Sequence, residues 1–330
     1  MLNKKLLCLG AIAITAALSA GCNRSPEAKE AEYLKSGRAL LAKNDTGRAL
    51  LEFMNAAKIM PKDAEPYYQL GLTYLALHNP GTALGALKKA TELNPKRADA
   101  QLQMAKLMAT TQSQNLLQDA MNRLQSILAA SPDNLEAIDT MAIAEWKLGK
   151  TDGAEKLLEG ALAKSPADLK SAVMLSRMML NQKDPDGAEM VLKKAAATAP
   201  KSAAPALALG SLYAKLNQAD KAEAAFRNAL QLDPKSAVAL LGIATVQLAR
   251  RQLDQAEQTL RQVAALPGKE YKPQHAVFLY RTGKHEEALK EFEALAKADP
   301  EDRAARTRVV SIFSKSWMAC VYSISSFTLE

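Results

Sequence analysis

The sequence predicts an all-α solenoid of about eight helical hairpins between residues 30 and 302. The first observation behind this prediction is an alanine that recurs once per repeat of about 34 residues. The second is that a Leu or Phe follows each of these alanines four residues later, one helical turn further on. The third is composition, because 48% hydrophobic and 5% aromatic residues suit closely packed helices. The recurrent alanines are Ala49, Ala83, Ala120, Ala154, Ala188, Ala222, Ala256 and Ala288.

The stretch from Ala64 to Pro95 shows the repeat most completely. Counted from Ala64, it carries aromatic or bulky residues at positions 4, 7 and 11, Gly71 at position 8 and Ala83 at position 20. This order resembles the tetratricopeptide (TPR) repeat, a helix A–turn–helix B unit of 34 residues. The small residues suit a close crossing of helices A and B, and Pro95 cannot continue helix B because it lacks an N–H. The resemblance covers residues 30–302 and implies a right-handed superhelix.

The first 21 residues read as a signal peptide, with Lys4 and Lys5 before an apolar run and small residues up to Gly21. The segment around Cys22 resembles the lipobox of bacterial lipoproteins, which implies that Cys22 is acylated and becomes the first residue of the mature chain. It departs from that pattern because Ser19 stands where the family usually has Leu. An ordinary secretory signal followed by an incidental cysteine is the alternative. Asn23 after the cysteine favours the outer membrane over the inner one.

Residues 22–29 are short and polar, and we interpret them as a tether. The TPR array follows, and its third repeat has three extra residues within Thr110–Asn115. Good N-cap residues come two positions after five of the repeat prolines, at Asp63, Asn134, Asp168, Ser202 and Ser236. The predicted repeats start near residues 30, 64, 98, 135, 169, 203, 237 and 269.

Beyond Pro300 the pattern begins again and then fails, with many serines and aromatics. We interpret residues 303–330 as an irregular or truncated C-terminal tail, because an array usually closes with a polar capping helix. A poorly ordered terminus is the alternative.

Nothing in the sequence indicates catalysis. The three histidines, His78, His275 and His285, lack zinc-helix spacing, and no phosphate loop or Gly-x-Ser-x-Gly elbow occurs. No cofactor or metal is expected. The net charge of +8 is spread over mixed charges, which favours a solvated surface over a nucleic-acid footprint. The chain is therefore predicted not to be an enzyme and not to bind nucleic acid.

Binding is the remaining route to function. In the TPR family, positions 2, 5, 9 and 12 of helix A point into the concave groove. Carried over, these positions give a largely apolar groove with basic residues at position 9 of alternate repeats. The predicted groove-binding residues are Arg38, Tyr68, Lys106, Trp146 and Arg177. The alternative is that the apolar members simply pack neighbouring helices together. The Lys/Asn carboxylate clamp of some TPR domains is not present, because Leu34 and Arg38 occupy its first positions.

The resemblance implies a protein-interaction scaffold, anchored by lipid in the bacterial envelope and facing the periplasm, with other envelope proteins or peptides as partners. It looks most similar to TPR lipoproteins of exopolysaccharide and PEP-CTERM systems, and outer-membrane or pilus assembly are related possibilities. A module that binds an anionic polysaccharide is the alternative function.

Overall fold

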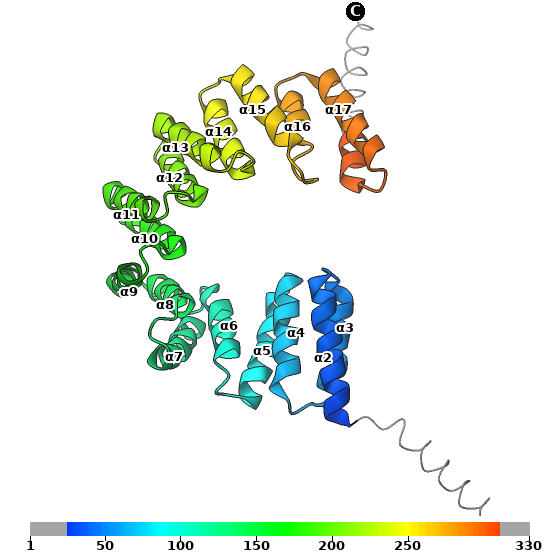
Figure 1. The fold of residues 1–330 in the computed structure, drawn as a ribbon, viewed down its shortest axis with the longest axis vertical. Helices are drawn as coiled ribbons and strands as arrows, with labels where there is room; N and C mark the ends of the chain where they lie inside the picture. The colour runs from blue at the N-terminus through cyan, green and yellow to red at the C-terminus, as the bar shows by residue number, and fades with distance from the viewer. Residues whose placement is uncertain (1–24, 311–330) are drawn as a thin grey trace, which may run out of the picture. The chain divides into compact units, whose positions relative to one another are not determined.

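The computed structural model describes residues 25–310, and every regular element in this range is an α-helix (Figure 1). The chain divides into two compact units, residues 1–157 and 158–330, which we describe separately. The signal peptide of residues 1–21 and the acylation site Cys22 lie outside the described residues. The predicted all-α fold class is confirmed.

The first unit consists of hairpins in which each helix A packs on its own helix B. Its helices are α2 (Pro26–Ala42), α3 (Thr46–Ile59), α4 (Ala64–Ala76), α5 (Pro80–Leu93), α6 (Ala98–Ala109), α7 (Gln114–Ala130) and α8 (Leu135–Lys147). Helix α9 (Thr151–Lys164) crosses the boundary, and its residues from Leu158 onward belong to the second unit.

The second unit repeats the same plan. Its complete helices are α10 (Leu169–Asn181), α11 (Pro185–Thr198), α12 (Ala203–Lys215), α13 (Ala219–Leu232), α14 (Ala237–Ala249), α15 (Leu253–Ala265), α16 (Gln274–Arg281) and α17 (His285–Ala298). A further helix runs over residues 303–310, up to the last residue that the structure describes.

The core of each hairpin forms where helices A and B cross. All eight recurrent alanines, from Ala49 to Ala288, are fully buried there. The facing residue of helix A must also be small: a Cβ on Gly71 would lie 2.6 Å from Cγ of Leu87. The alanine register therefore sets how closely the two helices of a hairpin approach.

The turn between helices A and B uses one residue in the left-handed region. Positive φ values of 55–87° occur at this turn in seven of the eight hairpins, at Asn44, His78, Gly149, Lys183, Asn217, Arg251 and Gly283. The third hairpin is the exception. Its three extra residues were expected at the turn, but they mostly lengthen helix B instead, since α7 has 17 residues against 14 in α5.

The predicted N-caps are largely in place. Side-chain oxygens of Asp63, Asn134, Ser202 and Ser236 accept from backbone N–H groups at the start of α4, α8, α12 and α14. Asp168 does not, because its Oδ2 accepts from the Ser171 hydroxyl at 2.6 Å.

The ends of the array differ from the sequence prediction. Helix α2 begins at Pro26, so residues 26–29 are not part of a tether: the Ser25 hydroxyl accepts from Ala28 N at 3.2 Å, and proline is favoured in the first helical turn. The predicted tail is also helical over residues 303–310, because Asp302 caps the N–H groups of Ala304 and Ala305. The eighth helix A is short, starting at Gln274 rather than near residue 269.

Candidate functional site

In the first unit, Arg38 is paired with an acid of the next repeat. The carboxylate of Glu65 in α4 binds both Arg38 of α2 and Arg97 before α6, and Gln69 donates to it at 2.8 Å. Burial would raise the pKa of Glu65, but the hydrogen bonds from Gln69, Arg97 and Arg38 outweigh it, and the pKa lies below its usual value. Arg38 therefore anchors α2 to α4.

Tyr68, the second predicted binding residue, lies beneath Arg97. The guanidinium carbon is 4.1 Å from the centre of the tyrosine ring, a cation–π contact, and Nε of Arg97 donates to Oδ1 of Asp99 at 2.8 Å. The tyrosine is half-buried against the apolar cluster of α4–α8. Burial and the nearby Asp99 carboxylate raise the pKa of its hydroxyl.

Lys106 repeats the pattern of Arg38. Its Nζ lies 2.5 Å from Oε1 of Glu136 in α8. In both pairs, a base at position 9 of one repeat meets an acid at position 2 of the next. The acidic partner expected from another protein is here supplied by the chain itself. Trp146 lies at the end of α8 and is half-buried.

The second unit holds Arg177 in a groove between two successive A helices, α10 and α12. The groove has a volume of about 320 Å³. Position 5 of each repeat contributes an apolar wall, with Val173 and Leu207, and Leu180 extends it at position 12. Arg177 at position 9 and Lys215 at the end of α12 supply its positive charges. These are the positions at which the sequence predicted a groove.

Exposed apolar side chains continue at the same positions on the next A helix. Val238, at position 2 of α14, is 58% exposed, and Leu248, at position 12, is also exposed. Leu241 lies between them and is half-buried. We call the α10–α12 groove and the matching positions of α14 the inner apolar face. Exposed apolar surface of this kind is typical of a site that another molecule covers.

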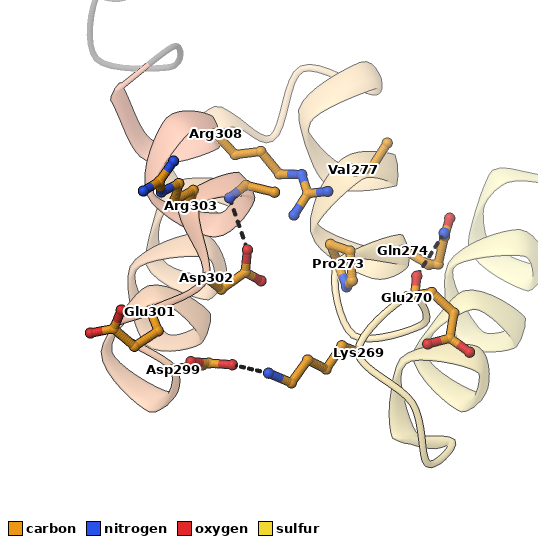
Figure 2. Close-up of a pocket in the computed structure, with 11 residues that line it drawn as sticks. Lys269, Glu270, Pro273, Gln274, Val277, Asp299, Glu301, Asp302, Arg303 and Arg308 are labelled. Atoms are coloured by element: carbon orange, nitrogen blue, oxygen red, sulfur yellow. Dashed lines mark hydrogen bonds and ion pairs between the residues drawn. The ribbon is translucent and has the colours of Figure 1, made fainter. Parts of the chain in front are cut away.

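A second hollow lies further along this unit, between α16 and the helix of residues 303–310, and its chemistry is different. It has a volume of about 830 Å³ and is lined mainly by charged and polar side chains. Figure 2 shows the ion pair between Lys269 and Asp299 on one side, and Arg308 extending across the opening towards α16. Acids and bases are both present, so this hollow does not select one sign of charge.

A polar network around the buried His275 joins α15, α16 and α17. His275, which is 5% exposed, has its Nδ1 2.8 Å from Oε1 of Glu291, and its Nε2 accepts from Nε of Arg261 at 3.2 Å. Arg261 and Lys284 both pair with Glu257. The histidine is therefore a structural residue that holds three helices together. His78 lies at the α4–α5 turn, and His285 is the first residue of α17.

Sequence reasoning missed the acids Glu65 and Glu136 and the aromatic-bound Arg97. A signal was present for these two acids, because the repeat that follows each position-9 base, Arg38 and Lys106, carries an acid at its position 2. Arg97 had no such signal, since it lies between repeats.

Within residues 25–310, no cluster of His, Cys, Asp and Glu is arranged to hold a metal ion. No described helix has both the length and the apolar character needed to cross a bilayer.

Three family models match the chain, and all describe tetratricopeptide repeats. The TPR domain of cytochrome c-type biogenesis protein H matches residues 58–160. One tetratricopeptide repeat model matches residues 179–226 and 220–272, and another matches residues 275–310. A comparison with curated proteins found no match.

Solved structures of the same fold include yeast Tom70 and PilW. Tom70 is 18% identical, with a TM-score of 0.64, and the match covers 92% of this chain and 66% of Tom70. PilW, described as a widely conserved type IV pilus biogenesis factor, is 19% identical with a TM-score of 0.53, over 66% of this chain and 97% of PilW. At these identities the similarity establishes the fold alone.

Proposed function

Because the chain belongs to the tetratricopeptide-repeat family and is a scaffold of the kind that binds other proteins, we propose that its inner apolar face binds a segment of an envelope protein. The observation that carries this proposal is the exposure of Val173 on α10 and of Val238 and Leu248 on α14, at groove positions, beside a groove that Leu207 of α12 also lines. No catalytic family is among the matches, and the scaffold acts by holding its partner.

The charges of the groove define the partner further. Arg177 and Lys215 line a channel whose other lining residues are apolar apart from Ser176 and Ser211, and no acidic side chain lines it. A segment with apolar side chains spaced along one face of a helix, and one acidic residue beside them, complements these walls. Burying the apolar side chains of the partner helix would supply most of the affinity. The charges of Arg177 and Lys215 would attract its acidic residue and so fix where along the groove the helix binds.

The first unit supports a different role. Arg38 and Lys106 already have acidic partners, and Tyr68 is covered by Arg97. This arrangement weakens the alternative of an anionic polysaccharide, which would need those basic groups to bind sulfate or carboxylate. We assign these residues to the joints between hairpins and place partner binding in the second unit.

We further propose that the chain is anchored by lipid at Cys22 in the outer membrane, where it faces the periplasm. This proposal is supported by Lys4 and Lys5, the apolar run and the small residues before Cys22. Envelope assembly machines, including exopolysaccharide export and type IV pilus biogenesis, are the systems in which we would seek the partner. The intact mass of the mature chain, expressed as a precursor in a bacterium with two membranes, tests the anchor. An acylated Cys22 start supports it, and cleavage elsewhere without lipid overturns it.

Photo-crosslinking in cells tests the binding face. A benzoylphenylalanine at Val238 should crosslink to a partner protein, whereas the same residue at Leu51 on α3 should not. The two positions are matched, because their side chains are 58% and 59% exposed. Arg177→Glu and Val173→Asp should each reduce the Val238 crosslink at least about tenfold, the equivalent of 1.4 kcal/mol, without changing the circular dichroism melt.

Two results would contradict this assignment. Crosslinking from Leu51 but not from Val238 would place the partner on another face. A loss of helicity in the Arg177 and Val173 variants, together with the lost crosslink, would show that these residues belong to the core. Trp146→Ala tests whether the first unit takes part in this binding. Because we place partner binding in the second unit, we expect this variant to leave the Val238 crosslink unchanged.

A further inference from the structure

A second apolar pocket lies in the second unit, between the B helices α9 and α11 and the A helix α10. It has a volume of about 350 Å³. Leu175, which is fully buried, and the half-buried Met179 come from α10, and Leu162 of α9 and Val191 of α11 form facing walls. Met190 borders the pocket and is 65% exposed. The pocket therefore combines an apolar lining with an opening to solvent.

This pocket is separate from the inner apolar face. Val173 and Arg177 of α10 line the α10–α12 groove, whereas Leu175 and Met179 line the pocket. Residues two apart on an α-helix are about 200° apart around its axis, so Val173 and Arg177 point away from Leu175 and Met179, and the linings given for the two sites share no residue. A ligand could occupy one site without touching the other.

Two other repeats have a tyrosine at the position where this joint has Met179. Met179 stands at position 11, where the second and sixth repeats have Tyr74 and Tyr213. Tyr74 packs against the apolar clusters of both the first hairpin and its own. The Tyr213 hydroxyl hydrogen-bonds to Glu189 on the preceding helix B, and its ring is buried. At those two joints a tyrosine ring therefore fills the space between successive hairpins. At the fifth repeat Met179 takes its place, and it is half-buried and borders the pocket.

We propose that this pocket binds a single aromatic ring of a partner polypeptide, most simply a tyrosine side chain, in the place that Tyr74 and Tyr213 fill elsewhere. The chain itself shows that a phenol ring suits such a joint. Met179 and Met190 are adaptable and make favourable sulfur contacts with aromatic edges. Glu159, which also lines the pocket, offers an acceptor for a phenol hydroxyl, as Glu189 does for Tyr213. A buried aromatic anchor in a pocket of this kind is a common hot spot of protein interfaces.

A titration with p-cresol, the side chain of tyrosine, tests the proposal on the full chain. With methionine methyl groups labelled with ¹³C, the Met179 and Met190 signals should shift and saturate, with a dissociation constant of about 1 mM, typical of so small a ligand. Met54 is the internal control, because it is an exposed methionine on α3, in the other unit. We expect its signal to stay in place. 4-Methylcyclohexanol, the saturated counterpart, should bind at least several-fold more weakly.

Substitutions at Met179 test whether a ring supplied by the chain itself fills the pocket and so prevents p-cresol from binding there. Met179→Tyr should supply the ring from within, abolish the p-cresol shift at Met190 and raise the melting temperature, and Met179→Phe is the fallback if the hydroxyl is not accepted. Met54→Tyr should leave the titration unchanged. Arg177→Glu should also leave it unchanged, so that failure of the groove proposal and failure of this one can be told apart.

Three outcomes would overturn the proposal. One is the absence of saturable shifts at Met179 and Met190 up to the solubility limit of p-cresol. The second is an equal shift at Met54, which would indicate general association with exposed methionines. The third is equal affinity for 4-methylcyclohexanol, which would make the pocket a site for any apolar group rather than for an aromatic ring.

Discussion

The ammonium of Lys147, in α8, donates to the carbonyl oxygen of Ala109 at the end of α6, at 2.8 Å. It also donates to the next two carbonyl oxygens, those of Thr110 and Thr111, at 2.9 and 3.0 Å. The last carbonyls of a helix lack partners within the helix, and a cation there also favours the helix dipole. The third hairpin is the one whose turn lacks a left-handed residue. A lysine from the fourth hairpin therefore completes the end of a helix in the third.

Lys147→Ala should lower the free energy of unfolding by about 1–2 kcal/mol, because three carbonyl groups lose a charged donor. Urea unfolding followed by circular dichroism measures this. Lys150→Ala, three residues away on an exposed side chain, is the control and should change stability by less than about 0.5 kcal/mol. Equal effects of the two substitutions would show that charge, and not the carbonyl contacts, matters.

Two glycines with opposite surroundings test the close crossing of helices A and B. Gly71→Ala should cost about 1–3 kcal/mol, since its Cβ would meet Cγ of Leu87 at 2.6 Å. Gly85→Ala should instead stabilise by up to about 1 kcal/mol, because it is a helical residue with nothing within 4 Å of the new Cβ. Thermal melts of both variants give the comparison. If Gly71→Ala is neutral, the crossing has more room than its geometry indicates.

Glu30 provides a pH-dependent test at the first hairpin. Its side chain is 6% exposed and its Oε1 has no hydrogen-bond partner. Burial raises its pKa, and the carboxylates of Asp63, Glu27 and Glu65 raise it further. The folded chain therefore holds this proton at a pH where the unfolded chain has lost it, so this group's contribution to stability falls as pH rises above about 4.3, the usual pKa of Glu.

Glu30→Gln should accordingly raise the melting temperature at pH 7, and the gain should disappear as the pH approaches 4. Glu92→Gln, on an exposed side chain, should give no such pH-dependent gain. A Glu30→Gln variant that is less stable than the parent at pH 7 would mean that the carboxylate is stabilised by a contact.

Glu65 should behave in the opposite way. Its pKa is lowered in the folded chain, because the bonds from Gln69, Arg97 and Arg38 outweigh its burial. Its contribution to stability is present above the unfolded pKa of about 4.3 and is lost as pH falls through the lower, folded pKa. Glu65→Gln should therefore lower the melting temperature at pH 7, and the difference from the parent should shrink in acid. A difference that does not change between pH 7 and pH 3 would contradict this.

The hairpins were predictable because few residues determine them. The eight alanines, each followed by Leu or Phe, fix both the register and the close crossing, and the same alanines are fully buried in the structure. The positions of the α10–α12 groove were predictable for the same reason, since a helical repeat places positions 5, 9 and 12 on one side. Arg177 was found in this way.

The contacts between hairpins were not predictable from the repeat alone. Whether a position-9 base pairs with the next hairpin depends on position 2 of the following repeat, as Glu65 shows for Arg38. Asp168 had the residue type of an N-cap but bonds to Ser171 instead. The ends were also missed, because Ser25 and Asp302 start helices through local caps that lie outside the repeat pattern.

The bond from Lys147 to the end of α6 limits how such an array can grow by gene duplication. Residues 131–134 link the third hairpin to the fourth. A hairpin inserted there, or the loss of either of these two hairpins, would separate Lys147 from the carbonyl groups to which it donates. The third and fourth hairpins must therefore be inherited together, as one recombination unit. In the other seven hairpins, a left-handed residue of the hairpin itself forms the turn after helix A. Recombination breakpoints at the borders of those hairpins therefore leave their turns intact.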